Sequence, residues 1–166
     1  MPERSDAVTL IAITSSVVVT DQLTKFLLTS AIDAGRMASR VGLVDGWLAL
    51  EYTENRGAAF GLFSGLDLIL ASASVAILAT LLWSFFRQAR PPSRQTVATG
   101  AIVGGALGNL IDRVRLGHVI DFVSVGPWPN FNVADSAITI GVLVLAWGMT
   151  RQASSLDIAR PIDLGS

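Results

Sequence analysis

Two aspartates in the second half of this 166-residue sequence have the residue type and the spacing for acid–base chemistry. Asp121 lies in the segment HVIDFV, which we expect to be a loop or a surface helix, and Asp135 lies in the segment FNVADS, in the first turn of a predicted helix. Two carboxylates held close together away from bulk water do not both ionise easily, so such a pair keeps one proton. The ionised member can activate a water molecule, while the protonated member stabilises a peptide carbonyl and helps the amine to leave. This chemistry needs neither a metal nor a covalent intermediate.

A purely structural role for the two aspartates is the alternative. Asp135 could lie at the start of a helix, where free N–H groups and the helix dipole favour a carboxylate. Asp121 could pair with Arg113, Arg115 or His118, which precede it closely in the sequence. The residues alone leave both roles open. We assign no catalytic role to His118, because we expect it in an exposed loop and no serine or cysteine motif accompanies it.

The composition argues against several other kinds of site. The chain has no cysteine and one histidine, which excludes disulfides and thiolate nucleophiles and disfavours a zinc site. The only lysine, Lys25, could activate a serine, but Ser15 and Ser16 lie deep in the same predicted helix and far along its axis. A net charge of −1 without a basic stretch gives no support for nucleic-acid binding. We therefore expect no metal, no cofactor and no nucleic-acid partner.

The elements that must position these residues are those of a small integral membrane protein. Hydrophobic residues make up 51% of the chain and charged residues 15%, which is too apolar for an ordinary soluble domain of this size. Four segments approach the length of about 20 apolar residues that crosses a bilayer; they are residues 7–28, 68–86, 96–111 and 133–150. We expect the first segment to be retained rather than cleaved as a signal peptide, because it carries Asp21 and Lys25 and its leader is not net positive.

The short loop between the second and third segments predicts the orientation in the membrane. Its sequence RQARPPSRQ contains Arg87, Arg90 and Arg94 and no acidic residue, which is typical of a cytoplasmic loop. With four spans, both termini are then cytoplasmic, and the polar interruptions of the spans all lie at the outer end. Charges tolerated without a function would scatter over both ends, so this clustering indicates a site near the outer face.

A glycine pattern in the third segment predicts how that segment packs. Gly100, Gly104 and Gly108 are spaced four residues apart and therefore share one helix face. Small residues at this spacing let a second helix backbone approach closely. We expect a tight helix contact that holds the following polar residues in place.

The connection between the first two segments is too long for a simple turn. Residues 41–63 alternate apolar and polar positions in places and are rich in valine, leucine and aromatic residues, which predicts a small β-structure on the outer side. We expect Trp47, Tyr52, Phe60 and Trp128 at the membrane interface. Residues 1–150 are interpreted as one membrane domain, and residues 151–166 as a disordered cytoplasmic tail.

Two other classes of function remain open on the residues alone. A transporter could use Asp21, Lys25, Asp121 and Asp135 as relay groups, but it would need polar residues through the full depth of the membrane. The inner halves of the second, third and fourth segments carry no ionisable residue. A noncatalytic assembly or lipid-binding protein would need only the glycine pattern and the outer loop, and the aspartates would then be idle.

Five short motifs, taken together and in order, resemble those of the bacterial lipoprotein signal peptidases, also called signal peptidase II. The motifs are DQLTK at 21–25, NRGAAFG at 55–61, GNLIDR at 108–113, VIDF at 119–122 and FNVADS at 131–136. The resemblance covers roughly residues 7–150. Each motif is weak alone, but the ordered set at one predicted membrane face is highly specific.

The resemblance implies an all-α membrane protein with four transmembrane helices, a small extracytoplasmic β-cradle and a short periplasmic helix. It implies an aspartic endopeptidase of the bacterial cytoplasmic (inner) membrane. The implied substrate is a prolipoprotein whose cysteine carries a diacylglyceryl group, and cleavage falls on the N-terminal side of that cysteine. We expect the enzyme to act as a monomer in contact with membrane lipids.

The resemblance also assigns the site. It implies that Asp121 and Asp135 are the catalytic pair. The surrounding family positions are Asp21, Lys25, Asn55, Gly57, Asn109, Asp112, Arg113 and Asn132.

Physical chemistry suggests a role for each surrounding residue. Asp21 and Lys25 are spaced i, i+4, so we expect them to pair and brace the structure. Arg113 offers a planar fork for a peptide carbonyl or a carboxylate, and we expect Asp112 to neutralise it. The three asparagines have donor and acceptor atoms that suit gripping a peptide or orienting the aspartates. Gly57 would let the backbone turn or approach the substrate closely.

Overall fold

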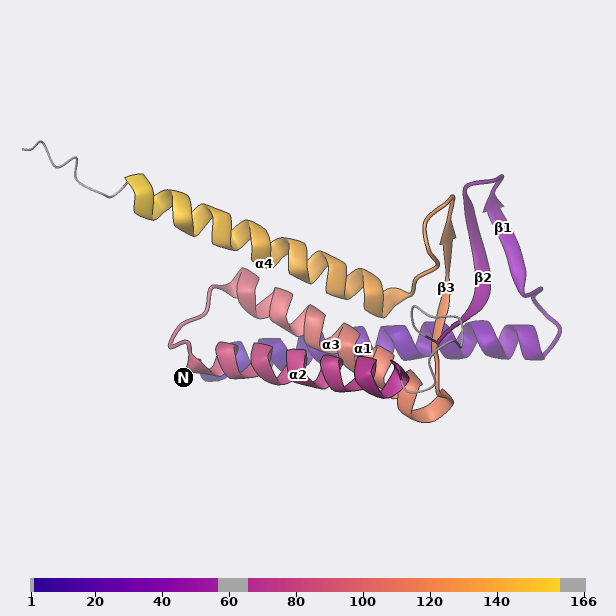
Figure 1. The fold of residues 1–166 in the computed structure, drawn as a ribbon, viewed down its shortest axis with the longest axis horizontal. Coiled ribbons are helices and arrows are strands. Elements are labelled where there is room, and N and C mark those ends of the chain that lie inside the picture. Colours follow the sequence, from indigo (N-terminus) through magenta and orange to yellow (C-terminus); the bar gives the residue numbers. More distant parts are fainter. Residues whose placement is uncertain (1, 57–65, 159–166) are drawn as a thin grey trace, which may run out of the picture.

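The fold is seen in a computed structural model, which describes residues 2–56 and 66–158. Its elements are, in order, α1 (Arg4–Asp33), β1 (Arg40–Val44), β2 (Leu48–Asn55), α2 (Leu66–Arg87), α3 (Ser93–Leu116), β3 (Val119–Val125) and α4 (Val133–Ile158). The helices run side by side, and the three strands stand together at one end of the bundle (Figure 1). The N-terminus lies at the opposite end. Below, these two ends are called the sheet end and the terminal end.

Two of the helices have the length and hydropathy of membrane spans within the part of the chain that the structure describes. They are Arg4–Asp33 and Val133–Arg151. Large apolar side chains on both helices point outward, among them Ile11 and Val19 on α1 and Leu143 and Trp147 on α4, and each is more than half exposed. Soluble proteins rarely expose continuous apolar surface of this kind, so the bundle presents a surface suited to lipid.

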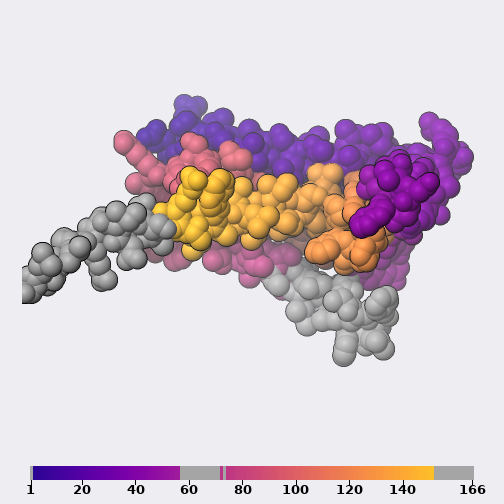
Figure 2. Space-filling view, turned by 90° about the horizontal axis from the view of Figure 1, so that it is seen from above, coloured from indigo at the N-terminus to yellow at the C-terminus, as the bar shows by residue number. Residues whose placement is uncertain are grey.

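Helix α3 is the central helix, because it packs against each of the other three. Seen from above, α4 lies over the middle of the bundle, with α1 along one side (Figure 2). A Cβ atom added to Gly104 would lie 2.7 Å from the Cβ of Val17 on α1, and one added to Gly105 would lie 2.4 Å from the carbonyl oxygen of Ala134 on α4. The tight contact predicted from the glycine spacing is thus confirmed, with α1 as the partner of Gly104 and α4 as the partner of the neighbouring glycine.

The sheet is antiparallel, with the strand order β1-β2-β3. Strands β1 and β2 form a hairpin whose turn includes Gly46 at a φ of 72°, a left-handed conformation that favours glycine. This hairpin confirms the predicted small β-structure within residues 40–55, whereas residues 57–63, including Phe60, lie outside the described residues. Thr53 on β2 faces Asp121 on β3 in the register.

Strand β3 corrects the prediction of a loop or a surface helix around Asp121. Helix α3 ends at Gly117, which adopts a left-handed φ of 76° and whose N–H bonds to the carbonyl of Arg113. The following segment VIDFVSV is rich in β-branched residues, and its first four residues are all buried. A strand buried on both faces lacks the polar alternation that marks a strand in a sequence, so the pattern was not recognised.

The helices extend beyond their predicted apolar segments. Helix α3 continues through the polar turn to Leu116 rather than ending at residue 111, because nothing in the sequence stops it before Gly117. Helix α4 continues to Ile158, so residues 151–158, which were expected to be disordered, are helical. Each of the four helices has at least 22 residues; the expected short periplasmic helix does not occur within residues 2–56 and 66–158.

Candidate active site

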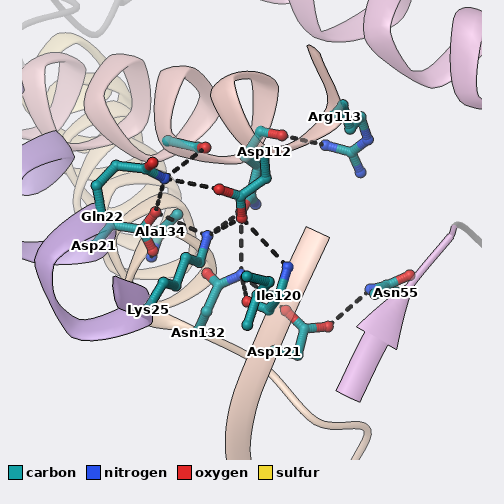
Figure 3. Close-up of polar contacts among 12 residues, drawn as sticks. Asp21, Gln22, Lys25, Asn55, Asp112, Arg113, Ile120, Asp121, Asn132 and Ala134 are labelled. Atoms are coloured by element: carbon teal, nitrogen blue, oxygen red, sulfur yellow. Dashed lines mark hydrogen bonds and ion pairs between the residues drawn. The ribbon is translucent and has the colours of Figure 1, made fainter. Parts of the chain in front are cut away.

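Polar residues from α1, α3, β3 and the start of α4 converge at the sheet end, as Figure 3 shows. The helices bring Asp21, Lys25, Asn109 and Asp112 to this point, and all four side chains are buried. Strand β3 and the turn before α4 bring Asp121 and Asn132, which are also buried. These six residues lie far apart in the sequence, so only the packing of α3 against α1 and α4 makes them one site.

Lys25, Asp21 and Asp112 form a buried ion cluster, referred to below as the lysine cluster. The ammonium of Lys25 lies 2.8 Å from Asp21 Oδ2 and 2.6 Å from Asp112 Oδ2. The predicted pairing of Asp21 with Lys25 is confirmed, but Asp112 pairs with Lys25 rather than with Arg113. Because Lys25 contacts both carboxylates, its removal would leave two buried charges without a counter-charge, which is strongly destabilising.

Gln22 was not recognised from the sequence as a site residue, yet its amide lies inside this network. Its Nε2 lies 2.8 Å from Asp112 Oδ1, 3.2 Å from Asp21 Oδ2 and 3.3 Å from the carbonyl oxygen of Gly108. Its position beside Asp21 in the first motif was the one feature of the sequence that could have indicated a role for Gln22 in the site. Asp112 Oδ2 also accepts a bond of 3.3 Å from the backbone N–H of Ile120, which ties β3 to α3.

The N-terminus of α4 is held by two side chains. Asn132 precedes the helix, and its Oδ1 accepts from the N–H of Asp135 at 2.9 Å, while Asp135 Oδ2 accepts from the N–H of Asn132 at 3.3 Å. This reciprocal pair is a capping box. Asp21 on α1 accepts a third N–H of this turn, from Ala134 at 3.0 Å. The structural role considered for Asp135 is therefore real, and it coexists with a place in the site.

Asp121 and Asp135, referred to below as the aspartate pair, are joined through neutral amides. Asn132 Nδ2 lies 2.8 Å from Asp121 Oδ1, and Asn55 Nδ2 lies 2.9 Å from Asp121 Oδ2. Asn109 Nδ2 lies 2.7 Å from Asp135 Oδ1. Asn132 thus bonds to both aspartates, through its side chain to one and through both its side chain and its backbone to the other.

The environment of Asp121 on strand β3 favours its protonated form. Burial raises the pKa of the Asp121 carboxyl to about 6, and the nearby Asp135 carboxylate adds to the increase. Hydrogen bonds from Asn55 and Asn132 and the positive charge of Lys25 lower the same pKa but do not cancel the effect of burial. A carboxyl with this pKa can give and take a proton near neutral pH.

Several predicted residues are less closely engaged. Arg113 is half-buried and donates to the carbonyl of Asn109 at 3.3 Å, and among the described residues it forms no ion pair. His118 is 13% exposed rather than fully exposed, and its Nε2 lies 3.8 Å from Glu54 Oε1. Neither Arg113, Arg115 nor His118 bonds to Asp121 within the described part of the chain. Gly57 lies outside the described residues.

A groove of about 520 Å³ opens beside Asp135. It is lined by Asn55, Trp128, Phe131, Asp135, Ser136 and Ile140, among others. The hydrogen bond of 2.7 Å between Asn130 Nδ2 and Thr53 Oγ1 holds the loop that forms one wall. The groove has a mixed lining of amide, hydroxyl and large apolar groups, which suits an extended peptide with an apolar side chain.

Comparison with known proteins identifies the family. Residues 13–151 match the model of the family described as Signal peptidase (SPase) II. A lipoprotein signal peptidase of Syntrophotalea carbinolica is 40% identical over 158 residues, which cover 87% of this chain and 95% of that protein. One from Syntrophomonas wolfei is 49% identical over 104 residues, covering 62% of this chain and 68% of that protein.

A solved structure described as a bacterial membrane enzyme has a similar fold. It superposes with a TM-score of 0.77 at 30% identity and covers 95% of this chain and 94% of its own. The apolar helices and this neighbour agree on a membrane protein. With a family match that spans most of the sequence, the chain belongs to the signal peptidase II family.

Proposed function

We propose that this protein removes the signal peptide from diacylglyceryl-modified prolipoproteins by cutting N-terminal to the lipidated cysteine, with Asp121 and Asp135 as its catalytic pair. Family membership supports the reaction and the substrate class. The observation that carries the assignment of the pair is Asn132, which bonds to both carboxylates. A single chain supplies both aspartates, which supports action as a monomer.

The two aspartates have different surroundings, which supports different roles. Asp121 binds its proton more tightly because of burial, so it is the acid that donates to the oxygen of the scissile carbonyl. Asp135 lies at the N-terminus of α4, where free N–H groups and the helix dipole stabilise negative charge. Asp135 is therefore the base that accepts a proton from the attacking water.

The proposed steps balance without any other reactant. The water oxygen bonds to the carbonyl carbon as Asp135 takes one water proton and Asp121 gives its proton to the carbonyl oxygen. The tetrahedral intermediate then breaks its C–N bond, and Asp135 gives its proton to the departing amine. Asp121 recovers a proton from one hydroxyl of the intermediate as the new carboxyl group forms, which restores the starting enzyme.

The proposed setting is a four-span topology with both termini in the cytoplasm. The arginines of the loop between α2 and α3 support a cytoplasmic terminal end. The sheet end, with the groove and the aspartate pair, would then lie near the outer face. The diacylglyceryl group would stay in the lipid beside α4 while the peptide enters the groove along Phe131 and Ile140.

The test of the catalytic pair is a cleavage assay on purified protein with a diacylglyceryl-modified prolipoprotein. Asp121→Asn and Asp135→Asn should each remain folded and reduce cleavage by at least about 1,000-fold. Asp45→Asn, at an exposed aspartate in the turn of the outer hairpin, is the matched control and should cleave normally. Unlipidated precursor should remain uncut. Normal cleavage by either site variant would refute the proposed mechanism.

The topology has its own test, because the chain has no cysteine. A single cysteine at Asp45 should react with a membrane-impermeant thiol reagent added to intact cells. A single cysteine at Gln88, in the loop after α2, should react only after the membrane is opened. The reverse pattern would overturn the orientation and leave the catalytic assignment intact.

A further inference from the structure

A second hollow lies at the terminal end of the bundle, far from the aspartate pair. It has a volume of about 370 Å³ and lies between the last turns of α2, the first turns of α3 and the second half of α4. This volume falls within the range of ligand sites. Helices α2 and α4 both pack against α3 but hardly touch each other, and α4 inclines away from α2 towards its own C-terminal end (Figure 1).

The hollow has apolar and polar lining residues. Leu81, Val144 and Leu145 are among the apolar ones, whereas Gln88, Arg94 and Gln95 supply polar groups near the α2–α3 loop. This division matches an acyl chain that leads to a polar headgroup at the membrane surface.

Arg94 lies at the centre of the polar part. A smaller hollow of about 100 Å³ lies between Arg94, Trp147 and Arg151, and it shares Arg94, Val144 and Gly148 with the larger one. The Arg94 side chain reaches from α3 to α4, where its Nε lies 3.5 Å from the position of a Cβ on Gly148. Arg94 is exposed, and among the described residues it forms no ion pair.

The surroundings of Arg94 are positively charged. Arg87 lies over the ring of Trp83 at 4.9 Å, and Arg151 lies over the ring of Trp147 at 4.5 Å. Among the described residues, Arg90 of the α2–α3 loop pairs with an acidic residue, Glu3, at 3.2 Å. Basic pockets between membrane helices are suited to the phosphate groups of anionic lipids, and tryptophan rings favour the same depth.

We infer that the hollow between α2, α3 and α4 binds one anionic diacyl phospholipid, with its phosphate on Arg94 and an acyl chain along Leu81 and Val144. This site is separate from the groove beside Asp135. The inference depends on the proposed membrane setting of the bundle but not on the catalytic pair. A lipid held there would fill the space between α2 and α4 and join these two helices at the terminal end.

Lipid retention measured by native mass spectrometry tests the site. The purified full-length protein in detergent is offered an equimolar mixture of phosphatidylglycerol and phosphatidylcholine of equal chain length. The wild type should retain phosphatidylglycerol about fivefold over phosphatidylcholine, and Arg94→Gln should reduce this preference to near unity, because one arginine supplies a factor of about this size. Arg36→Gln, which removes an exposed arginine at the sheet end, is the matched control and should keep the preference.

A second variant distinguishes binding in the hollow between α2, α3 and α4 from a general effect of surface charge. A Cβ atom added at Gly148 would contact only the movable end of Arg94, at 3.5 Å, and Gly148 lines the hollow, so we expect Gly148→Leu to fold and to fill the hollow. Its melting temperature should match that of the wild type, and its lipid retention should fall although every arginine remains. Equal retention by wild type and Gly148→Leu would overturn the site.

Three other outcomes would also overturn the inference. They are equal retention of the two lipids by the wild type, an effect of Arg36→Gln as large as that of Arg94→Gln, and competition by water-soluble glycerol phosphate as effective as that by intact lipid. Prolipoprotein cleavage is measured in parallel and should stay within about twofold in all three variants. Failure of lipid retention with normal cleavage would therefore count against this site alone.

Discussion

The lysine cluster and the aspartate pair lie next to each other at the sheet end, yet their carboxylates have different partners. In the lysine cluster, Lys25 lies within 2.8 Å of both Asp21 and Asp112. In the aspartate pair, the direct partners of Asp121 are the neutral amides of Asn55 and Asn132. Asn109 joins the two groups, since its Oδ1 faces Lys25 at 3.4 Å and its Nδ2 faces Asp135 at 2.7 Å.

This difference in partners supports the proposed division of roles, in which the lysine cluster is a brace and the aspartate pair reacts. In the lysine cluster, each carboxylate contacts the Lys25 ammonium, which ties α1 to α3. A carboxyl surrounded by neutral amides and another carboxylate exchanges its proton near neutral pH, as the pKa of about 6 for Asp121 indicates. The lysine cluster fixes α1, α3 and α4, and the amides transmit that fixed geometry to the aspartate pair.

Removal of the central cation gives the largest expected effect. Lys25→Met leaves Asp21 and Asp112 buried without a counter-charge, so we expect a loss of about 3–5 kcal/mol in the free energy of unfolding. Thermal or denaturant unfolding in detergent measures this loss. Arg40→Gln removes the exposed pair with Glu51 on the β1–β2 hairpin and should cost less than about 1 kcal/mol. Equal losses in the two variants would show that the lysine cluster is not a brace.

The residue that joins the two aspartates comes next. Asn132→Ala removes the contact with Asp121 and the cap of α4, so we expect kcat to fall about 100-fold through misplacement of the pair and stability to fall by about 1 kcal/mol. Asn130→Ala, two residues earlier and bonded only to Thr53 among the described residues, should change kcat much less. Cleavage kinetics on both variants measure the two effects. A wild-type kcat in Asn132→Ala would contradict the proposal that Asn132 positions the aspartate pair.

The proposed acid role of Asp121 predicts a definite pH dependence. Its pKa is raised to about 6, so the protonated form required for catalysis is lost as the pH rises through that value. We expect kcat/KM to fall with increasing pH above about 6, by up to tenfold per pH unit. A profile that rises from about pH 5 to about pH 8 would show that Asp121 acts as the base instead.

The smallest effect is expected outside both groups. His118 lies three residues before Asp121, but its nearest described partner is Glu54 on β2. We expect His118→Gln to keep kcat/KM within about twofold of the wild type and to leave the pH profile unchanged. If the decrease in kcat/KM above about pH 6 disappeared in this variant, the group that titrates near pH 6 would be the histidine rather than Asp121.

Some helices and strands could be predicted from the sequence and others could not, for physical reasons. Helix length and apolar content marked the four helices, and the spacing of Gly100, Gly104 and Gly108 predicted a close helix contact. The alternation in residues 41–63 predicted the outer hairpin. Strand β3 escaped recognition because burial on both faces removes the alternation, and the helix ends were misjudged because polar turns continued α3 and α4.

The site shows the same division between local and distant signals. The i, i+4 spacing of Asp21 and Lys25 predicted their pairing, since both lie on one helix. The third member, Asp112, was assigned to its neighbour Arg113, because local spacing cannot indicate a partner on another helix. Gln22 was given no role for the same reason, since its contacts lie on α3.

The sequence by itself determined which residues are available for chemistry: one lysine, no cysteine, and acidic motifs that resemble those of a known peptidase family. It also determined the apolar helices and the small residues that let them approach. Only the tertiary structure decided which carboxylate receives the cation and which keeps its proton. Those choices depend on burial and on atoms within about 3 Å that come from distant parts of the chain, and a linear pattern does not contain these distances.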